Sequence, residues 1–138
     1  MESAPRIDAR SASLLRLGAL LGLLGVSFGA FGAHGLEGAL EDLDPEAVAE
    51  RLGWWETAAQ YHLLHAVALV AGVAARGARG RVPALFLAAG IAVFSGTLYA
   101  MGLGAPRWFG AITPIGGVLL MVGWGLAINE ARAPDDAQ

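Results

Sequence analysis

The polar side chains that could carry chemistry gather around one stretch, QYHLLHAVALVAGVAA, residues 60–75. His62 and His65 enter this otherwise apolar run three residues apart, and residues with that spacing share one face of a helix. Two imidazoles on one helix face suit metal coordination. His34 would supply a third ligand and leave an open position for water or substrate.

The same residues admit a structural interpretation. Each histidine could instead bond to a Ser, Thr or Tyr side chain or a backbone carbonyl, and such interhelical bonds specify packing although they contribute only ~0.6 kcal/mol on average. No H-E-x-x-H pattern is present, and no carboxylate is assured nearby. The sequence favours a structural network over proton, quinone or small-molecule handling and over metal or haem ligation, but leaves all three open. The candidate ligand or network residues are His34, Tyr61, His62, His65, Ser95, Thr97, Tyr99 and Thr113.

The composition of the chain indicates which solvent surrounds these groups. Of 138 residues, 56% are hydrophobic and only 15% are charged, and the mean hydropathy is +0.56. A soluble domain of this size could not hide so much apolar surface. The 20 glycines, many of them inside apolar runs, are tolerated better in membrane helices than in soluble ones. Because there is no cysteine, disulfides and thiolate metal sites are excluded.

Four apolar segments are each close to the ~20 residues that a helix needs to cross a bilayer. They span about 14–33, 54–75, 82–103 and 108–128, and they predict an all-α, integral membrane four-helix bundle. The first segment could be a cleaved signal peptide, but its apolar run is long and three more follow, which favours a retained helix. We expect the tails, 1–13 and 129–138, to be disordered.

The arginines predict the orientation of the bundle. Only Arg51 and Arg107 fall on the side that carries the first loop, and that loop is acidic between Glu37 and Glu50. The other seven fall on the opposite side: Arg6, Arg10, Arg16, Arg76, Arg79, Arg81 and Arg132. The positive-inside rule therefore predicts that both termini are cytoplasmic.

The acidic loop also carries apolar residues at helical spacing, and Asp44-Pro45 is typical of a helix N-terminus. This pattern predicts one or two short amphipathic helices on the outer surface, with a solvated connector as the equal alternative. With this orientation, most polar groups of the membrane segments fall in the outer half. At 100° per residue, Glu56 and Gln60 point nearly opposite to His65.

Small and aromatic residues add packing signals. The first segment carries a glycine stripe with two G-x-x-x-G repeats, which permits close helix contact within the bundle or, less favoured, across a dimer. The stripe comprises Gly18, Gly22, Gly25, Gly29 and Gly32. Trp54, Trp55, Trp108 and Tyr99 are typical of an interfacial belt, and Pro114 predicts a kink in the fourth helix.

Four ordered blocks carry a resemblance to a known family: GAFGAHGL at 29–36, WETAAQYHLLHA at 55–66, FSGTLY at 94–99 and TPIGGVLLMVGW at 113–124. Together they resemble the YgdD/YwdK-type family of small bacterial inner-membrane proteins, which has eukaryotic small transmembrane relatives. The resemblance implies an inner-membrane location and four helices, but no established activity. Its motif positions correspond to Gly32, His34, Trp55, Tyr61, His62, His65, Ser95, Gly96, Tyr99, Thr113, Pro114, Gly116 and Gly117.

The functional hypothesis is a small accessory or scaffold protein of the bacterial inner membrane with a structural polar network. The alternative is binding or transport of a small molecule, proton, quinone or metal at the His/Tyr cluster near the outer face. The sequence indicates no enzyme and no cofactor. We expect the lipid bilayer as its environment, a homo-oligomer or another membrane protein as a possible partner, and no nucleic acid, since no basic patch of useful size is present.

Overall fold

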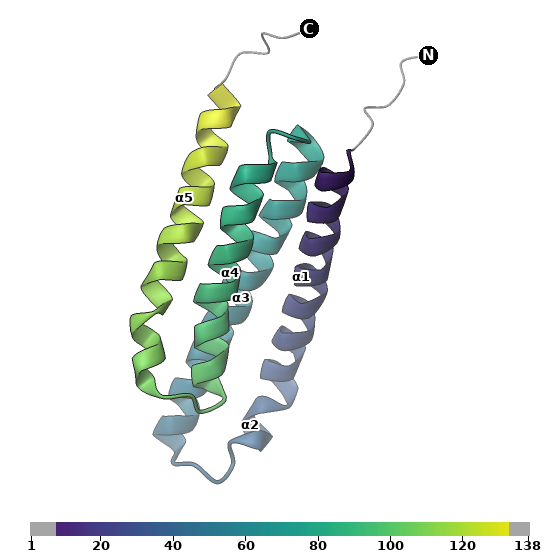
Figure 1. Ribbon diagram of the computed structural model, residues 1–138. Coiled ribbons are helices and arrows are strands. Elements are labelled where there is room, and N and C mark those ends of the chain that lie inside the picture. The colour runs from purple at the N-terminus through teal and green to yellow at the C-terminus, as the bar shows by residue number, and fades with distance from the viewer. Residues whose placement is uncertain (1–7, 133–138) are drawn as a thin grey trace, which may run out of the picture.

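The computed structural model describes residues 8–132, and every regular element in that range is a helix. The elements are α1 (Ala9–His34), α2 (Leu36–Ala39), α3 (Pro45–Arg76), α4 (Arg81–Gly102), η1 (Arg107–Ala111) and α5 (Thr113–Arg132). Figure 1 shows that α1 begins and α5 ends at the same end of the molecule. We call this the terminal end, and the opposite end, with α2 and η1, the loop end.

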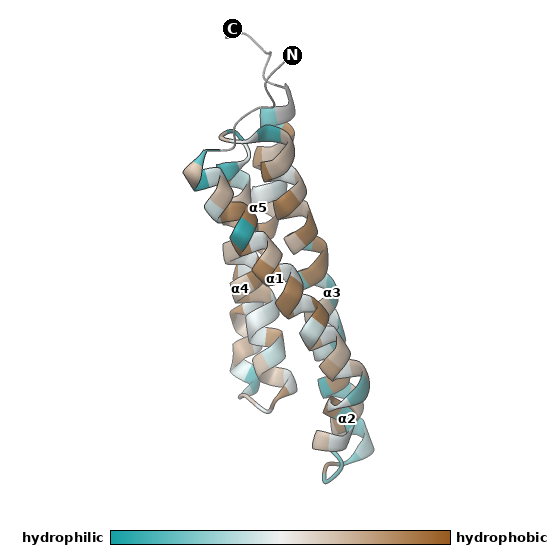
Figure 2. Ribbon diagram, turned by 90° about the vertical axis from the view of Figure 1, so that its right-hand side faces the viewer, coloured by the Kyte–Doolittle hydropathy of each residue, from teal (hydrophilic) through white to brown (hydrophobic). Residues whose placement is uncertain are grey.

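Four helical stretches are long and apolar enough to cross a membrane: Ala9–His34, Pro45–Arg76, Arg81–Gly102 and Arg107–Glu130. In Figure 2 brown, apolar residues dominate the shafts of the helices, and teal, polar residues concentrate toward the two ends. The predicted all-α class with four candidate membrane spans is therefore confirmed.

The helices pack mainly in a series, α1 against α3, α3 against α4 and α4 against α5, while α1 has little contact with α4. Two buried clusters hold this series together. One lies toward the loop end and includes Leu36, Trp55 and Tyr99. The other lies toward the terminal end and includes Leu69 and Leu87. Because α1 and α5 stand at the two ends of the series, most of their surface remains exposed.

The first helix begins earlier than predicted, at Ala9, so residues 9–13 are helical rather than part of a disordered tail. Asp8 caps the helix by accepting hydrogen bonds from the backbone N–H groups of Arg10 and Ser11. It also accepts from the Ser11 hydroxyl and pairs with Arg81 of α4 at 2.7 Å. The Ser11 and Arg81 contacts together hold the pKa of Asp8 well below its usual range. The predicted tail residues 1–7 and 133–138 lie outside the described residues.

The acidic loop is helical in two parts. Its first part forms the short α2, whose Leu36 is fully buried. Its second part is not a separate surface helix, since α3 begins at Pro45 and continues without interruption through the membrane segment to Arg76. The predicted start at Trp54 was therefore wrong. Gly53 does not break the helix, and the apolar side chains of Val48 and Leu52 pack against the loop-end cluster.

The first turns of α3, residues 45–54, contact the segment between α4 and α5, which contains η1. Arg107 of η1 pairs with Glu50 at 2.5 Å and lies over the Trp54 ring at 5.9 Å. The Arg51 guanidinium lies beside Gly104, whose φ of +104° makes the turn after α4 one that favours glycine. Both arginines predicted for this side thus contact the junction of α3 with the α4–η1 turn.

The last span also differs from expectation. It begins with the 3-10 helix η1, and α5 follows from Thr113 to Arg132, so residues 129–132 are helical rather than disordered. Pro114 is the second residue of α5. In the first turn of a helix its missing N–H costs no intrahelical bond, so the predicted kink within the helix is replaced by a helix start.

The glycine stripe of α1 divides between two environments. A Cβ on Gly18 would lie 2.6 Å from Val70, one on Gly25 would lie 2.9 Å from Leu63, and one on Gly32 would lie 2.7 Å from the Trp55 indole nitrogen. These three glycines, spaced by seven, bring α1 close to α3. Gly22 and Gly29 have no atom within 4 Å of an added Cβ, so they face open space.

Glycines not singled out as a packing stripe bring α4 and α5 together. A Cβ on Gly90 would lie 2.6 Å from Leu120, and one on Gly123 would lie 2.9 Å from Leu87. At Gly116 the contact is with backbone rather than a side chain, since a Cβ would meet the backbone nitrogen of Phe94 and lie 2.7 Å from its Cα. Backbone cannot rotate away as a side chain can, so this position admits only glycine.

We therefore expect Gly116→Ala to lower the free energy of unfolding by about 1–3 kcal/mol through overpacking. Gly125→Ala on the same helix, with no atom within 4 Å of the added carbon, serves as the control and should remain neutral or stabilise slightly, since alanine has the higher helix propensity. Denaturant unfolding of both variants in detergent micelles measures the difference. Equal stability of the two variants would contradict the close contact of α4 with α5.

Candidate functional site

The candidate polar residues are positioned mainly by the antiparallel pair α3 and α4. His62 of α3 and Tyr99 of α4 meet inside the loop-end half, where the His62 Nδ1 lies 3.3 Å from the Tyr99 hydroxyl. His62 is 3% exposed and Tyr99 is 8% exposed. Which atom donates depends on the imidazole tautomer. The two side chains thus form one interhelical hydrogen bond in the protein interior.

Aromatic rings enclose this pair. Phe28 of α1 meets the Tyr99 ring edge-on at a centroid distance of 4.9 Å, and Trp55 lies 4.6 Å from Tyr99. The Trp55 indole N–H donates to the Phe28 carbonyl at 2.7 Å, which links α3 to α1. Trp55 is 5% exposed, so Trp55 and Tyr99 pack inside the bundle, and their place in an interfacial belt stays a prediction. Trp108, by contrast, is well exposed.

His65 belongs to a second group of side chains. Its Nδ1 lies 2.7 Å from the backbone carbonyl of Tyr61, one turn earlier on the same helix. The Tyr61 ring stacks on Phe94 of α4 at 4.6 Å, and the Trp124 ring of α5 meets His65 at 6.2 Å. His62 and His65 therefore share neither a bonding partner nor a ring contact.

A third group joins α4 to α5. The hydroxyls of Thr97 and Thr113 lie 2.8 Å apart. The single hydroxyl proton of Thr97 is shared within its own helix between the carbonyl oxygens of Val93 and Phe94, so Thr113 is the donor when the two hydroxyls bond. Hydroxyls that bond to each other and to helical carbonyls have little capacity left for a ligand.

The remaining candidates lie apart from one another. His34 is exposed at the loop end of α1, whereas Ser95 is 1% exposed. The Ser95 Oγ and the His62 Nε2 are both buried, and within residues 8–132 neither has a hydrogen-bond partner. The structure thus divides the eight candidates among three bonded groups, an isolated serine and a surface histidine.

The geometry does not favour a metal site. In the described part of the chain, no three His, Asp or Glu side chains come together as ligands of one ion would. The His62 and His65 imidazoles contact different partners, and His34 is exposed. Among the candidate residues, all within the described part of the chain, the buried atoms left without a partner are one imidazole nitrogen and one serine hydroxyl, each able to bond to a small polar molecule.

Sequence reasoning missed the hydrogen bond of Trp55 with the Phe28 carbonyl. Its signal was the heptad spacing of Gly18, Gly25 and Gly32, because Gly32 leaves the space in which the indole lies. It also missed ion pairs between described residues, such as Asp8 with Arg81 and Glu50 with Arg107. These connect segments far apart in the sequence, and no local pattern reports them.

The four apolar helices and the interior polar groups define an integral membrane protein. Residues 28–117 match the family described as "Protein of unknown function (DUF423)", and the chain belongs to this family. It is 42% identical over 124 residues to the UPF0382 membrane protein YwdK of Bacillus subtilis, a match covering 83% of this chain and 92% of the relative.

Other relatives extend across bacteria. The UPF0382 inner membrane protein YgdD of Escherichia coli is 33% identical over 125 residues, covering 88% of this chain and 90% of the relative. A UPF0382 membrane protein of Staphylococcus epidermidis is 42% identical over 113 residues, covering 78% and 85%. No solved structure matches the chain. The predicted family and the bacterial inner-membrane location are confirmed, and no specific activity comes with them.

The structural interpretation of the aromatic cluster predicts the effect of removing one bond. Trp55→Phe should lower the free energy of unfolding by about 1 kcal/mol or more, since it removes the hydrogen bond to Phe28 and leaves part of the indole volume empty. Trp108→Phe changes an exposed ring and should have little effect. Thermal unfolding of both variants in the same detergent measures the contrast, and a stable Trp55→Phe protein would argue against this link between α1 and α3.

Proposed function

We propose that the protein is a small accessory or scaffold protein that associates with another membrane protein or with a second copy of itself. The observation that carries the proposal is the arrangement of the helices in series. The edge helices α1 and α5 keep most of their apolar surface exposed, and the polar groups of the interior bond mainly to one another.

The free face of α1 supports this proposal. Gly22 and Gly29 have nothing within 4 Å of an added Cβ, while the glycines between and beside them contact α3. Small residues on a free face let the backbone of another membrane helix approach closely. The proposal includes cytoplasmic termini, because seven of the nine arginines flank the membrane segments on the terminal side.

Copurification from native membranes tests the scaffold proposal. A tagged chain, solubilised in mild detergent, should elute with a second copy or a stoichiometric membrane protein. Gly22→Leu should reduce this recovery severalfold by blocking the free face, whereas Gly125→Leu on α5, also in open space, should not. A monomer without any copurifying protein would overturn the proposal.

A second candidate function rests on the two unbonded groups of the interior. The His62 Nε2 and the Ser95 Oγ are buried without a partner, and buried polar groups are normally satisfied by protein or water. An imidazole in this position could accept and release a proton, which would suit proton or small-molecule handling.

Proton flux into proteoliposomes tests this second candidate. If His62 carries protons, flux should exceed that of protein-free liposomes and be abolished in His62→Gln. His34→Gln changes the exposed histidine at the loop end and should leave the flux intact. Flux equal to that of empty liposomes would remove the candidate and leave the unbonded groups with a packing role.

A further inference from the structure

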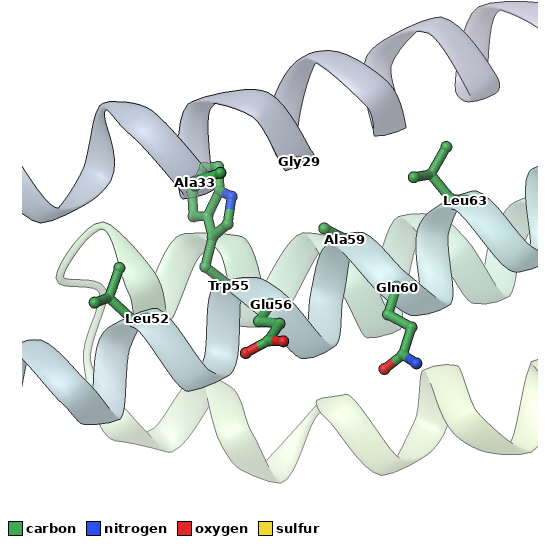
Figure 3. A pocket seen from close by; sticks show the side chains of 9 residues that line it. Gly29, Ala33, Leu52, Trp55, Glu56, Ala59, Gln60 and Leu63 are labelled. Carbon is green, nitrogen blue, oxygen red and sulfur yellow. The ribbon is translucent and has the colours of Figure 1, made fainter.

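A hollow of about 580 Å³ lies between α1 and α3 in the loop-end half of the molecule (Figure 3). Its floor consists of small side chains from both helices, including Gly29, Gly32, Ala33 and Ala59. Gly29 has no atom within 4 Å of an added Cβ, so this part of the floor is open, whereas the Trp55 indole covers Gly32. Such a floor suits an apolar chain lying along the helices.

Two polar side chains border this hollow. Glu56 and Gln60 are exposed, one helical turn apart on α3, and neither has a hydrogen bond within residues 8–132. In Figure 3 both side chains project from α3 on the side away from α1, so they flank the hollow and do not point into it. A carboxylate in a membrane-spanning segment is costly without a partner, so the Glu56 side chain calls for a cation or a hydrogen-bond donor.

The charge around the hollow is acidic. A second hollow of about 710 Å³ adjoins it toward the loop end, shares Ala33 and Leu52 with it, and is bordered by His34, Glu37 and Glu41. No arginine lines either hollow. Charge complementarity therefore favours a positively charged occupant.

The extent of the hollow decides between a lipid and a helix. It ends at Leu63, which Gly25 of α1 contacts. Further toward the terminal end, Gly18 packs directly on Leu69 and Val70. A partner helix would need a groove across the whole bilayer, whereas a lipid occupies one leaflet. On α3 its lining runs from Leu52 to Leu63, ~16 Å by the helical rise and about half of a ~30 Å hydrocarbon core, with the acidic second hollow adjoining it at the loop end.

We propose that this hollow binds a membrane lipid with a primary ammonium headgroup. The ammonium donates hydrogen bonds to the Glu56 carboxylate, and charge-assisted bonds of this kind are among the strongest in proteins. Gln60, ~6 Å deeper by the helical rise, bonds to the ester or phosphate oxygens, and an acyl chain lies over Gly29 and Ala59. This inference goes beyond the scaffold proposal because it names a small-molecule ligand; the two surfaces share Gly29, whereas Gly22 lies outside the hollow.

Native mass spectrometry of the intact protein in detergent tests the inference with three lipids of identical acyl chains. Phosphatidylethanolamine should bind about tenfold more tightly than phosphatidylcholine, which lacks N–H donors, or phosphatidylglycerol, which lacks the cation; tenfold corresponds to one charge-assisted hydrogen bond of moderate strength. Glu56→Gln should abolish this preference. Glu46→Gln, on the same helix but bordering neither hollow, should preserve it.

A second pair of variants tests the floor without altering charge. Gly29→Leu should weaken phosphatidylethanolamine binding at least fivefold by filling the hollow, as one buried side chain displaces a comparable length of acyl chain. Gly22→Leu, in open space outside the hollow, should not weaken it.

A photo-crosslinker at position 60 identifies the occupant in living cells. Adducts with the mass of an aminophospholipid support the inference, whereas adducts with a second copy or another protein overturn it. Equal binding of the three lipids, or equal effects of Glu56→Gln and Glu46→Gln, would also overturn it. None of these results depends on copurification of a protein partner, so the scaffold proposal can fail independently.

Discussion

The close approach of neighbouring helix backbones is the constraint on which the rest of the structure depends. In lipid, apolar surfaces gain little by associating, so helices are held by van der Waals contact and by polar groups between them. Gly18, Gly25 and Gly32 provide this approach for α1 and α3, and Gly90, Gly116 and Gly123 provide it for α4 and α5. The Trp55 and Leu120 side chains fill the space that a side chain at Gly32 or Gly90 would occupy. A large side chain on one helix therefore requires a glycine on the neighbouring helix.

The polar groups act within this frame according to depth. At the ends of the bundle, charges pair across long sequence separations, Asp8 with Arg81 and Glu50 with Arg107. Between them, neutral groups bond helix to helix, as His62 does to Tyr99. This order follows from solvation, because a charge near water costs far less than one at bilayer depth. The ends thus fix which loops meet, and the interior bonds fix how the helices are rotated.

The sequence predicted the features that depend on one helix at a time. Length and apolarity gave the four spans, and the helical period placed Glu56 and Gln60 away from His65; the structure has the first two exposed and His65 buried. The start of α3 was missed because acids between residues 46 and 50 are typical of a surface helix, while Gly53 was not a strong enough breaker to separate it from the membrane segment. The start of α1 was missed because the Asp8 cap gains its ion pair from residue 81.

The site could be predicted only as a set of residues, because its bonds depend on the register between helices. The spacing of His62 and His65 was correct for a shared face, yet the rotation of α3 directs His62 to Tyr99 and leaves His65 beside Tyr61 and Trp124. That register is fixed by close contacts such as Gly116 with Phe94, which no single helix specifies.

The central position of α3 follows from the unequal character of its faces. One face carries buried small residues, Ala58, Ala59 and Ala66, which allow both α1 and α4 to approach. His62 bonds within this interior, while Glu56 and Gln60 leave it for the lipid side. A helix with only a packing role would gain stability by replacing an unpaired carboxylate at membrane depth with leucine, since lipid favours apolar side chains. The presence of Glu56 beside a hollow that is open at Gly29 is therefore explained more simply by an occupant than by packing.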